Sequence, residues 1–183
     1  MRITVSGLPG SGTTSLARHL AEIRGYRLIS AGEVFRQMAR ERGLDLREFG
    51  RIAETEPSID REIDLRQREI AEREDDIIAE GRLSGWFVGN ADLRIWLQAP
   101  LSCRVERIFS RDTIQDRETA RLLTQEREAC EARRYQDYYS IDIRDLSPYH
   151  LVLNSEKFAV EELSAIVETA IRVIEEKKRG EAR

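Results

Sequence analysis

A glycine-rich segment near the start of the chain has the residue types that bind phosphate. It consists of Gly7, Leu8, Pro9, Gly10, Ser11, Gly12, Thr13 and Thr14. Gly7, Gly12 and Thr14 match the pattern G-x-x-x-x-G-K-[ST], whose backbone N–H groups surround phosphate oxygens and whose last hydroxyl binds Mg²⁺. A plain tight turn is the alternative, but it would need only one or two glycines. We therefore expect all eight residues to bind a donor phosphate and Thr14 to contact the metal.

The lysine of that pattern is replaced by Thr13. In phosphate-binding loops this lysine reaches the β- and γ-phosphates. Its absence leaves two interpretations open. Either another cation covers these phosphates, or the site binds nucleotide without efficient transfer.

A second charged segment, Glu80-Gly81-Arg82, follows residues 76–79, Asp-Ile-Ile-Ala, which read as a buried strand. An acidic residue at the end of a buried strand can hold Mg²⁺, as in the Walker-B arrangement. An arginine two positions later would face phosphates at the carboxyl edge of the sheet. A turn that merely ends the strand is the alternative. We expect Glu80 to take part in metal binding and Arg82 in substrate binding and catalysis.

Two further groups could bind an anion and a nucleobase. Ser30 or its neighbour can cap a helix, and Arg36 lies far enough along that helix to point back at an anion. An ordinary cap with a solvated arginine is the alternative. Asp60, Asp64 and Gln67 have helical spacing on one face, and a carboxylate can accept a hydrogen bond from the cytosine amino group. A solvated charged helix remains equally open for these three.

Arginines are frequent in two predicted helices, and a guanidinium binds phosphate bidentately. They are Arg104, Arg107 and Arg111 in one helix and Arg127, Arg133 and Arg134 in the next. Pairing with Glu106, Glu126 and Glu131 must account for some of them. We expect Arg107, Arg111 and Arg134 to act in catalysis by closing over a triphosphate.

Strands and helices alternate along the chain. Short β-branched or apolar runs predict strands over residues 2–6, 26–30, 76–79, 93–97 and 150–153. Helical spacing covers residues 13–24, 31–42, 45–53, 57–73, 100–111, 116–139 and 160–178. This alternation predicts a five-stranded parallel sheet covered on both faces, in one α/β domain over residues 1–183. The core would be residues 1–32, 75–111 and 140–183, with inserts over about 33–74 and 112–139.

The composition excludes several classes of protein. The formal net charge is −4, whereas a general nucleic-acid binder is usually basic. No apolar run approaches the ~18 residues of a membrane span. Cys103 and Cys130 lack metal-ligand spacing, which favours free thiols in a reducing cytoplasm. We expect a cytoplasmic monomer whose partners are small-molecule nucleotides, not nucleic acids or membranes.

Four segments together resemble the archaeal-type cytidylate kinases, which belong to the P-loop nucleoside monophosphate kinase superfamily. They are the glycine-rich loop and residues 30–36, 80–86 and 141–154, and the similarity covers nearly the whole chain. The resemblance implies a three-layer P-loop NTPase fold with a monophosphate-binding insert and a short lid. It also implies ATP as donor, Mg²⁺, and CMP or dCMP as acceptor.

The resemblance assigns roles to individual residues. Gly7, Gly10, Gly12, Thr13 and Thr14 match the donor-phosphate loop, Ser30 and Arg36 the monophosphate region, Arg82 the acid-Gly-Arg motif, and Arg107, Arg111 and Arg134 the lid. Leu83 stands where bacterial-type enzymes have Asp, which leaves the choice between CMP and dCMP open. The alternatives are an adenylate-kinase-like enzyme, a kinase for another small acceptor, and a nucleotide-binding module with weak turnover.

Overall fold

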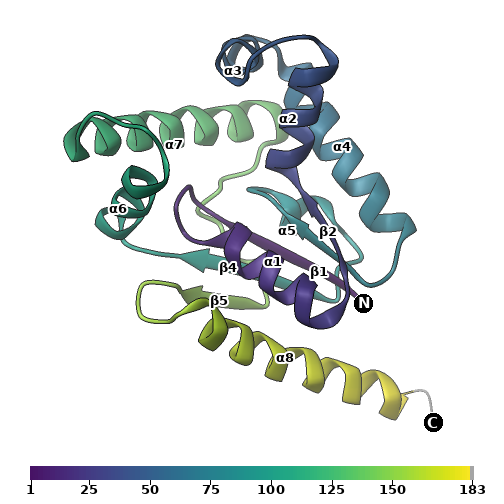
Figure 1. The fold of residues 1–183 in the computed structure, drawn as a ribbon. Coiled ribbons are helices and arrows are strands. Elements are labelled where there is room, and N and C mark those ends of the chain that lie inside the picture. The colour runs from purple at the N-terminus through teal and green to yellow at the C-terminus, as the bar shows by residue number, and fades with distance from the viewer. Residues whose placement is uncertain (182–183) are drawn as a thin grey trace.

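The computed structural model describes the backbone of residues 1–181 and all their side chains except those of residues 46, 47, 54 and 181. Its sheet has five parallel strands (Figure 1). They are β1 (Arg2–Gly7), β2 (Arg27–Ser30), β3 (Ile77–Glu80), β4 (Leu93–Gln98) and β5 (Leu151–Asn154). The strand order is β2-β3-β1-β4-β5. Glu80 pairs in register with Val5 and Ser30, so the carboxyl ends of the first three strands meet at one edge. The predicted five-stranded parallel sheet is confirmed.

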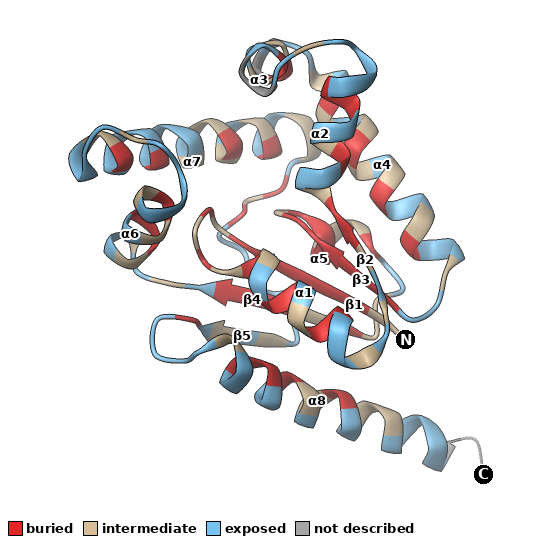
Figure 2. Ribbon diagram, in the orientation of Figure 1, coloured by how far each residue is buried: buried red, intermediate tan, exposed pale blue. Residues whose placement is uncertain are grey.

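Helices cover both faces of this sheet. They are α1 (Thr13–Arg24), α2 (Ala31–Glu41), α3 (Leu46–Thr55), α4 (Pro57–Arg73), α5 (Ser84–Phe87), α6 (Leu101–Arg111), α7 (Arg117–Tyr139) and α8 (Val160–Glu181). The helices α1 and α8 bury Leu16, Leu20 and Val167 against β1, β3 and β4. On the opposite face, α5 and the residues before β5 pack around Trp96 and Tyr149. Figure 2 shows β1 and β3 buried between these layers.

The ends of the helices follow the local sequence. Pro57 begins α4, where a missing backbone N–H costs nothing. Before α3, Asp45 accepts from the Glu48 backbone N–H at 2.8 Å, and Glu48 accepts from the Asp45 N–H at 3.3 Å. This reciprocal arrangement confirms the predicted cap. The four-residue helix α5 was not expected, because one turn is too short to show helical periodicity.

The helices α2, α3 and α4 share a core of their own. Phe49, Met38 and Ile59 are fully buried there, and Ile29 and Ile77 connect this core to the sheet. The long helix α7 packs on α6 and extends toward α4 across the carboxyl edge of the sheet (Figure 1). Among the described residues, none of the helices combines the length and apolar character that a membrane span requires.

Candidate functional site

A cleft of about 1560 Å³ lies at the carboxyl edge of the sheet, between the glycine-rich loop, α2, α4, α6 and α7. Most of the predicted site residues line it: Pro9, Gly10, Gly12, Thr13, Thr14, Ser30, Arg36, Asp60, Asp64, Gln67, Glu80, Arg82, Arg107, Arg111 and Arg134. The loop residues Gly7, Leu8 and Ser11 are not among the residues that line the cleft. Within the described range, the basic residues of the lining are all arginines.

The glycines of the loop are required by its geometry. Gly10 and Gly12 have φ of 80° and 94°, in the left-handed region where residues with a Cβ are strained. A Cβ on Gly7 would lie 2.4 Å from the Leu97 carbonyl oxygen. The chain can therefore turn this tightly from β1 into α1 only with glycine at these positions.

Side chains from other elements hold four carbonyl oxygens of the loop. The pairs are Arg82 Nη1 with Gly7 at 3.1 Å, Arg104 Nη1 with Pro9 at 3.2 Å, Arg107 Nη1 with Gly10 at 3.3 Å, and Ser155 Oγ with Ser11 at 2.6 Å. A trans peptide directs its N–H opposite to its C=O. The opposite N–H groups of two of these peptides belong to Gly10 and Gly12, which line the cleft and can face an anion there, whereas that of Ser11 donates to the Leu8 carbonyl at 3.1 Å.

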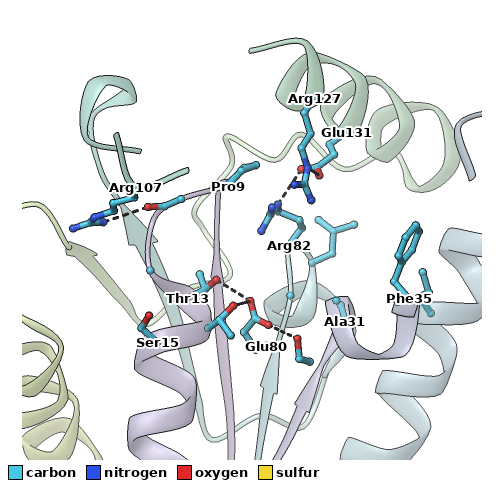
Figure 3. Close-up of a pocket in the computed structure, with 18 of the residues that line it drawn as sticks. Pro9, Thr13, Ser15, Ala31, Phe35, Glu80, Arg82, Arg107, Arg127 and Glu131 are labelled. Atoms are coloured by element: carbon cyan, nitrogen blue, oxygen red, sulfur yellow. Dashed lines mark hydrogen bonds and ion pairs between the residues drawn. The ribbon is translucent and has the colours of Figure 1, made fainter. Parts of the chain in front are cut away.

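Glu80 connects the loop to the start of α2. Its Oε1 accepts from the hydroxyls of Thr13 at 2.8 Å and Thr14 at 3.3 Å, and its Oε2 accepts from Ser30 at 2.7 Å. Figure 3 shows this carboxylate below the cleft with Thr13 beside it. Ser30 occupies the N-cap position of α2, but its hydroxyl does not cap the helix. It binds Glu80 instead, because a hydrogen bond to a carboxylate is the stronger one.

The oxygens at this point suit a magnesium ion. Mg²⁺ prefers oxygen ligands and is usually held by one or two carboxylates together with substrate phosphates. Thr14 and Glu80 supply a hydroxyl and a carboxylate next to the phosphate loop. The described part of the chain contains no group of three or more His, Cys, Asp or Glu that could hold a metal ion. The residues present fit the predicted ion.

Glu131 of α7 binds two arginines of the cleft (Figure 3). Its carboxylate accepts from Arg82 Nε at 2.9 Å and from Arg127 Nε at 2.8 Å. Burial alone would raise the pKa of Glu131, but the two guanidinium groups outweigh it and hold the pKa at about 2. Glu131 is therefore an anion at any pH near neutrality. Sequence reasoning assigned Glu131 only to salt-bridge formation, and it named Arg127 without selecting it for the site.

The two predicted arginines of α6 differ in their surroundings. Arg107 Nη2 donates to the Ser155 carbonyl at 2.6 Å, which fixes its side chain beside the loop. Arg111 is 63% exposed and pairs with Asp112 at the rim of the cleft. Ser155 was missed by sequence reasoning, although it follows β5 directly, as residues of the predicted site follow β2 and β3.

The residues predicted to recognise a nucleobase, Asp60, Asp64 and Gln67, lie together but already have partners within the chain. Asp60 forms an ion pair with Arg134 at 3.3 Å, and Asp64 accepts from the Tyr139 hydroxyl at 2.7 Å. Gln67 is buried, and its Nε2 donates to the backbone carbonyls of Ile29 at 3.3 Å and Glu80 at 2.8 Å. It therefore holds the ends of β2 and β3 together.

Phe35 adds an aromatic surface to the same side of the cleft. Its ring centre lies 4.7 Å from that of Phe49, which is fully buried. Arg36, the next residue, is exposed on α2 and also lines the cleft. The cleft thus offers an anion-binding loop at one end and carboxylates, an aromatic ring and further arginines at the other.

The pH dependence of stability should reveal the burial of Asp64. Burial raises its pKa to about 7, so the folded protein holds a proton that the unfolded chain releases at about pH 4. This contribution to stability is complete below about pH 4 and is lost as the pH rises to about 7. Over this pH range the free energy of unfolding of the wild type should therefore fall by up to about 4 kcal/mol, and Asp64→Asn should abolish this fall. Urea unfolding at several pH values would measure both.

The matched variant is Tyr139→Phe. The Tyr139 hydroxyl lowers the pKa of Asp64, so its removal should extend the fall in stability to a higher pH than in the wild type and make the total fall larger. Equal pH slopes for the wild type and Asp64→Asn would contradict this interpretation.

The sequence of the chain is similar to those of known proteins. The model of the cytidylate kinase-like family matches residues 2–157. The cytidylate kinase of Methanoregula boonei is 65% identical over 93% of this chain and 94% of its own length. That of Pyrococcus abyssi is 50% identical over 96% of both chains.

Two solved structures share the fold. Shikimate kinase from Bacteroides thetaiotaomicron superposes with a TM-score of 0.64 at 13% identity, over 94% of this chain and 98% of that one. Shikimate kinase from Acinetobacter baumannii, in complex with shikimate, gives 0.60 at 17% identity, over 94% and 93%. These identities bear on the fold alone, and the expected three-layer α/β arrangement is confirmed.

Proposed function

Because the chain belongs to the cytidylate kinase-like family, we propose that it transfers the γ-phosphate of ATP to CMP, and also to dCMP, giving the diphosphate and ADP. One observation carries the proposal. Glu80 joins the hydroxyls of the phosphate loop to Ser30 on the acceptor side, so a single cleft has a place for both phosphates.

On the donor side, the N–H groups of the loop would surround the triphosphate. Thr14 and Glu80 would hold Mg²⁺, which when bound neutralises charge on the phosphate oxygens. Thr13 keeps Glu80 in place by donating its hydroxyl. The positive charge that the missing lysine would supply comes from the arginines of the lining, chiefly Arg82 and Arg107.

On the acceptor side, Ser30, Arg36 and Arg82 would bind the monophosphate. Asp60 and Asp64 lie where a cytosine amino group could donate to a carboxylate. Gln67 would contribute through its amide oxygen, since its nitrogen is bound to backbone carbonyls. Arg134, which already pairs with Asp60, would help to position this carboxylate.

Phosphoryl transfer needs alignment and charge neutralisation more than covalent chemistry. The attacking atom is an anionic phosphate oxygen, so no general base is required. Arg82 would stabilise the transferring group from the carboxyl edge of the sheet, and Arg107, Arg111 and Arg134 would add charge from α6 and α7. We assign the catalytic roles to these four residues.

The two inserts would have different roles. Residues 33–74 would bind the monophosphate and residues 112–139 would form the lid. The second half of α7 contacts Arg82, Asp60 and Asp64, so closure would move chiefly the residues before it. Slower amide exchange in residues 112–126 with both nucleotides bound would support this division, and unchanged exchange would contradict it.

A coupled assay with ATP and a panel of nucleoside monophosphates tests the proposed function. CMP and dCMP should give the highest kcat/KM. A higher value for AMP would favour the adenylate-kinase-like alternative, and ATP binding without transfer to any monophosphate would favour a binding module. We also propose that the protein is a cytoplasmic monomer. Light scattering would support the monomeric state by a mass of 21.2 kDa.

A further inference from the structure

An arginine that lies outside the cleft lining connects α7 to the phosphate loop. Arg104 of α6 has a side chain only 6% exposed. Its Nη1 donates to the Pro9 carbonyl at 3.2 Å, and its guanidinium forms an ion pair with Glu128 of α7. A second contact joins Arg104 Nη2 to Glu128 Oε2 at 3.4 Å. Glu128 thus orients the group that holds Pro9.

A second connection of the same kind begins three residues later on α7. Glu131 has a side chain 9% exposed and accepts from Arg82 Nε at 2.9 Å. Arg82 in turn donates from Nη1 to the Gly7 carbonyl at 3.1 Å. One turn of α7 therefore reaches the loop twice, each time through a carboxylate, a guanidinium and a backbone carbonyl.

We propose that Glu128 and Glu131 are positioning residues through which α7 keeps the phosphate loop in its donor-binding conformation. The inference rests on the proposed function, since it takes the donor to be ATP. A loop without its lysine depends more on correctly directed N–H groups. The Pro9 carbonyl that Arg104 holds directs the N–H of Gly10, and the Gly7 carbonyl that Arg82 holds fixes the loop where it leaves β1.

The first test is direct titration of the full chain with magnesium-ATP by calorimetry. Glu128→Gln should weaken ATP binding about tenfold, the order expected for the loss of one charge-assisted hydrogen bond. Its KM for CMP should stay within about twofold, because Arg104 does not line the cleft. Glu131→Gln should raise both the Kd for ATP and the KM for CMP, because Arg82 also faces the acceptor.

Glu106→Gln is the matched control. Glu106 lies on α6, as Arg104 does, and pairs with Arg117 of α7, but both side chains are exposed. This variant should bind ATP as the wild type does. Wild-type affinity in Glu128→Gln and Glu131→Gln would overturn the proposal.

A double variant separates positioning from stability. Glu128→Gln leaves a buried arginine without its charged partner and should lower the melting temperature. Replacing both Arg104 and Glu128 by methionine should restore much of this stability, because a buried ion pair can often be exchanged for apolar side chains. It cannot restore the bond to Pro9, so ATP binding should remain about tenfold weak.

The outcomes distinguish the two proposals. If the double variant regained both stability and ATP affinity, the pair would be only structural and the inference would be wrong. If the wild type bound ATP but phosphorylated no monophosphate, the proposed function would fail, while the binding comparison would still decide the inference. A wild type that bound no ATP would overturn both.

Discussion

Arg82→Ala should lower kcat about a hundredfold to a thousandfold, the usual effect of removing one preorganised group that stabilises the transition state. Arg82 lines the cleft and is held by two groups, the Glu131 carboxylate and the Gly7 carbonyl. Its guanidinium therefore does not need to reorganise when charge develops on the transferring phosphoryl group. Steady-state kinetics with ATP and CMP would measure the loss.

Two variants make the result interpretable. Arg82→Lys keeps the charge but not the fork of N–H donors, so it should recover only part of the rate. Arg121→Ala removes an exposed arginine of α7 and should leave kcat unchanged. Circular dichroism would confirm that each protein folds. If Arg82→Ala kept more than about a tenth of the wild-type kcat, Arg82 would be a structural residue at the end of the strand.

Glu80→Gln should lower kcat about a hundredfold and raise the magnesium concentration needed for half-maximal rate. The carboxylate accepts three hydroxyl hydrogen bonds and is the acidic group beside Thr14. An amide has the same shape but no charge, and its nitrogen cannot accept a hydrogen bond. Either the hydroxyls of the phosphate loop or that of Ser30 would therefore lose the oxygen that now accepts from them.

A graded comparison tests this account. Thr13→Ala removes one of the three hydroxyls and should cost at most about tenfold in kcat. Glu72→Gln removes an exposed carboxylate that pairs with Arg68 on α4 and should have no effect. An unchanged rate and magnesium dependence in Glu80→Gln would show that Glu80 has no part in metal binding.

The sheet and the position of Glu80 could be predicted from the sequence because they depend on local patterns. Five apolar runs gave five strands, and parallel strands bring the residues after them to one edge. Gln67 shows where such reasoning ends. Helical spacing placed it correctly beside Asp64, but only the tertiary structure reveals that its amide nitrogen binds the carbonyls of β2 and β3.

The arginines of α6 show the same limit. Arg104, Arg107 and Arg111 lie on one helix at spacings of three and four residues. Their surroundings differ because of elements distant in sequence: Arg104 meets Glu128, Arg107 meets Ser155, and Arg111 remains at the rim. No local pattern contains that information.

The positive charge of the cleft lining comes from groups that stay protonated far above neutral pH. Of the described residues around the cleft, eight are arginines and none is a lysine: Arg18, Arg36, Arg82, Arg107, Arg111, Arg127, Arg133 and Arg134. A guanidinium keeps its proton far above neutral pH, whereas an ammonium in such a site can lose it. The attraction for phosphates therefore persists in alkaline solution, and acylating reagents that neutralise lysine would find no target in this lining.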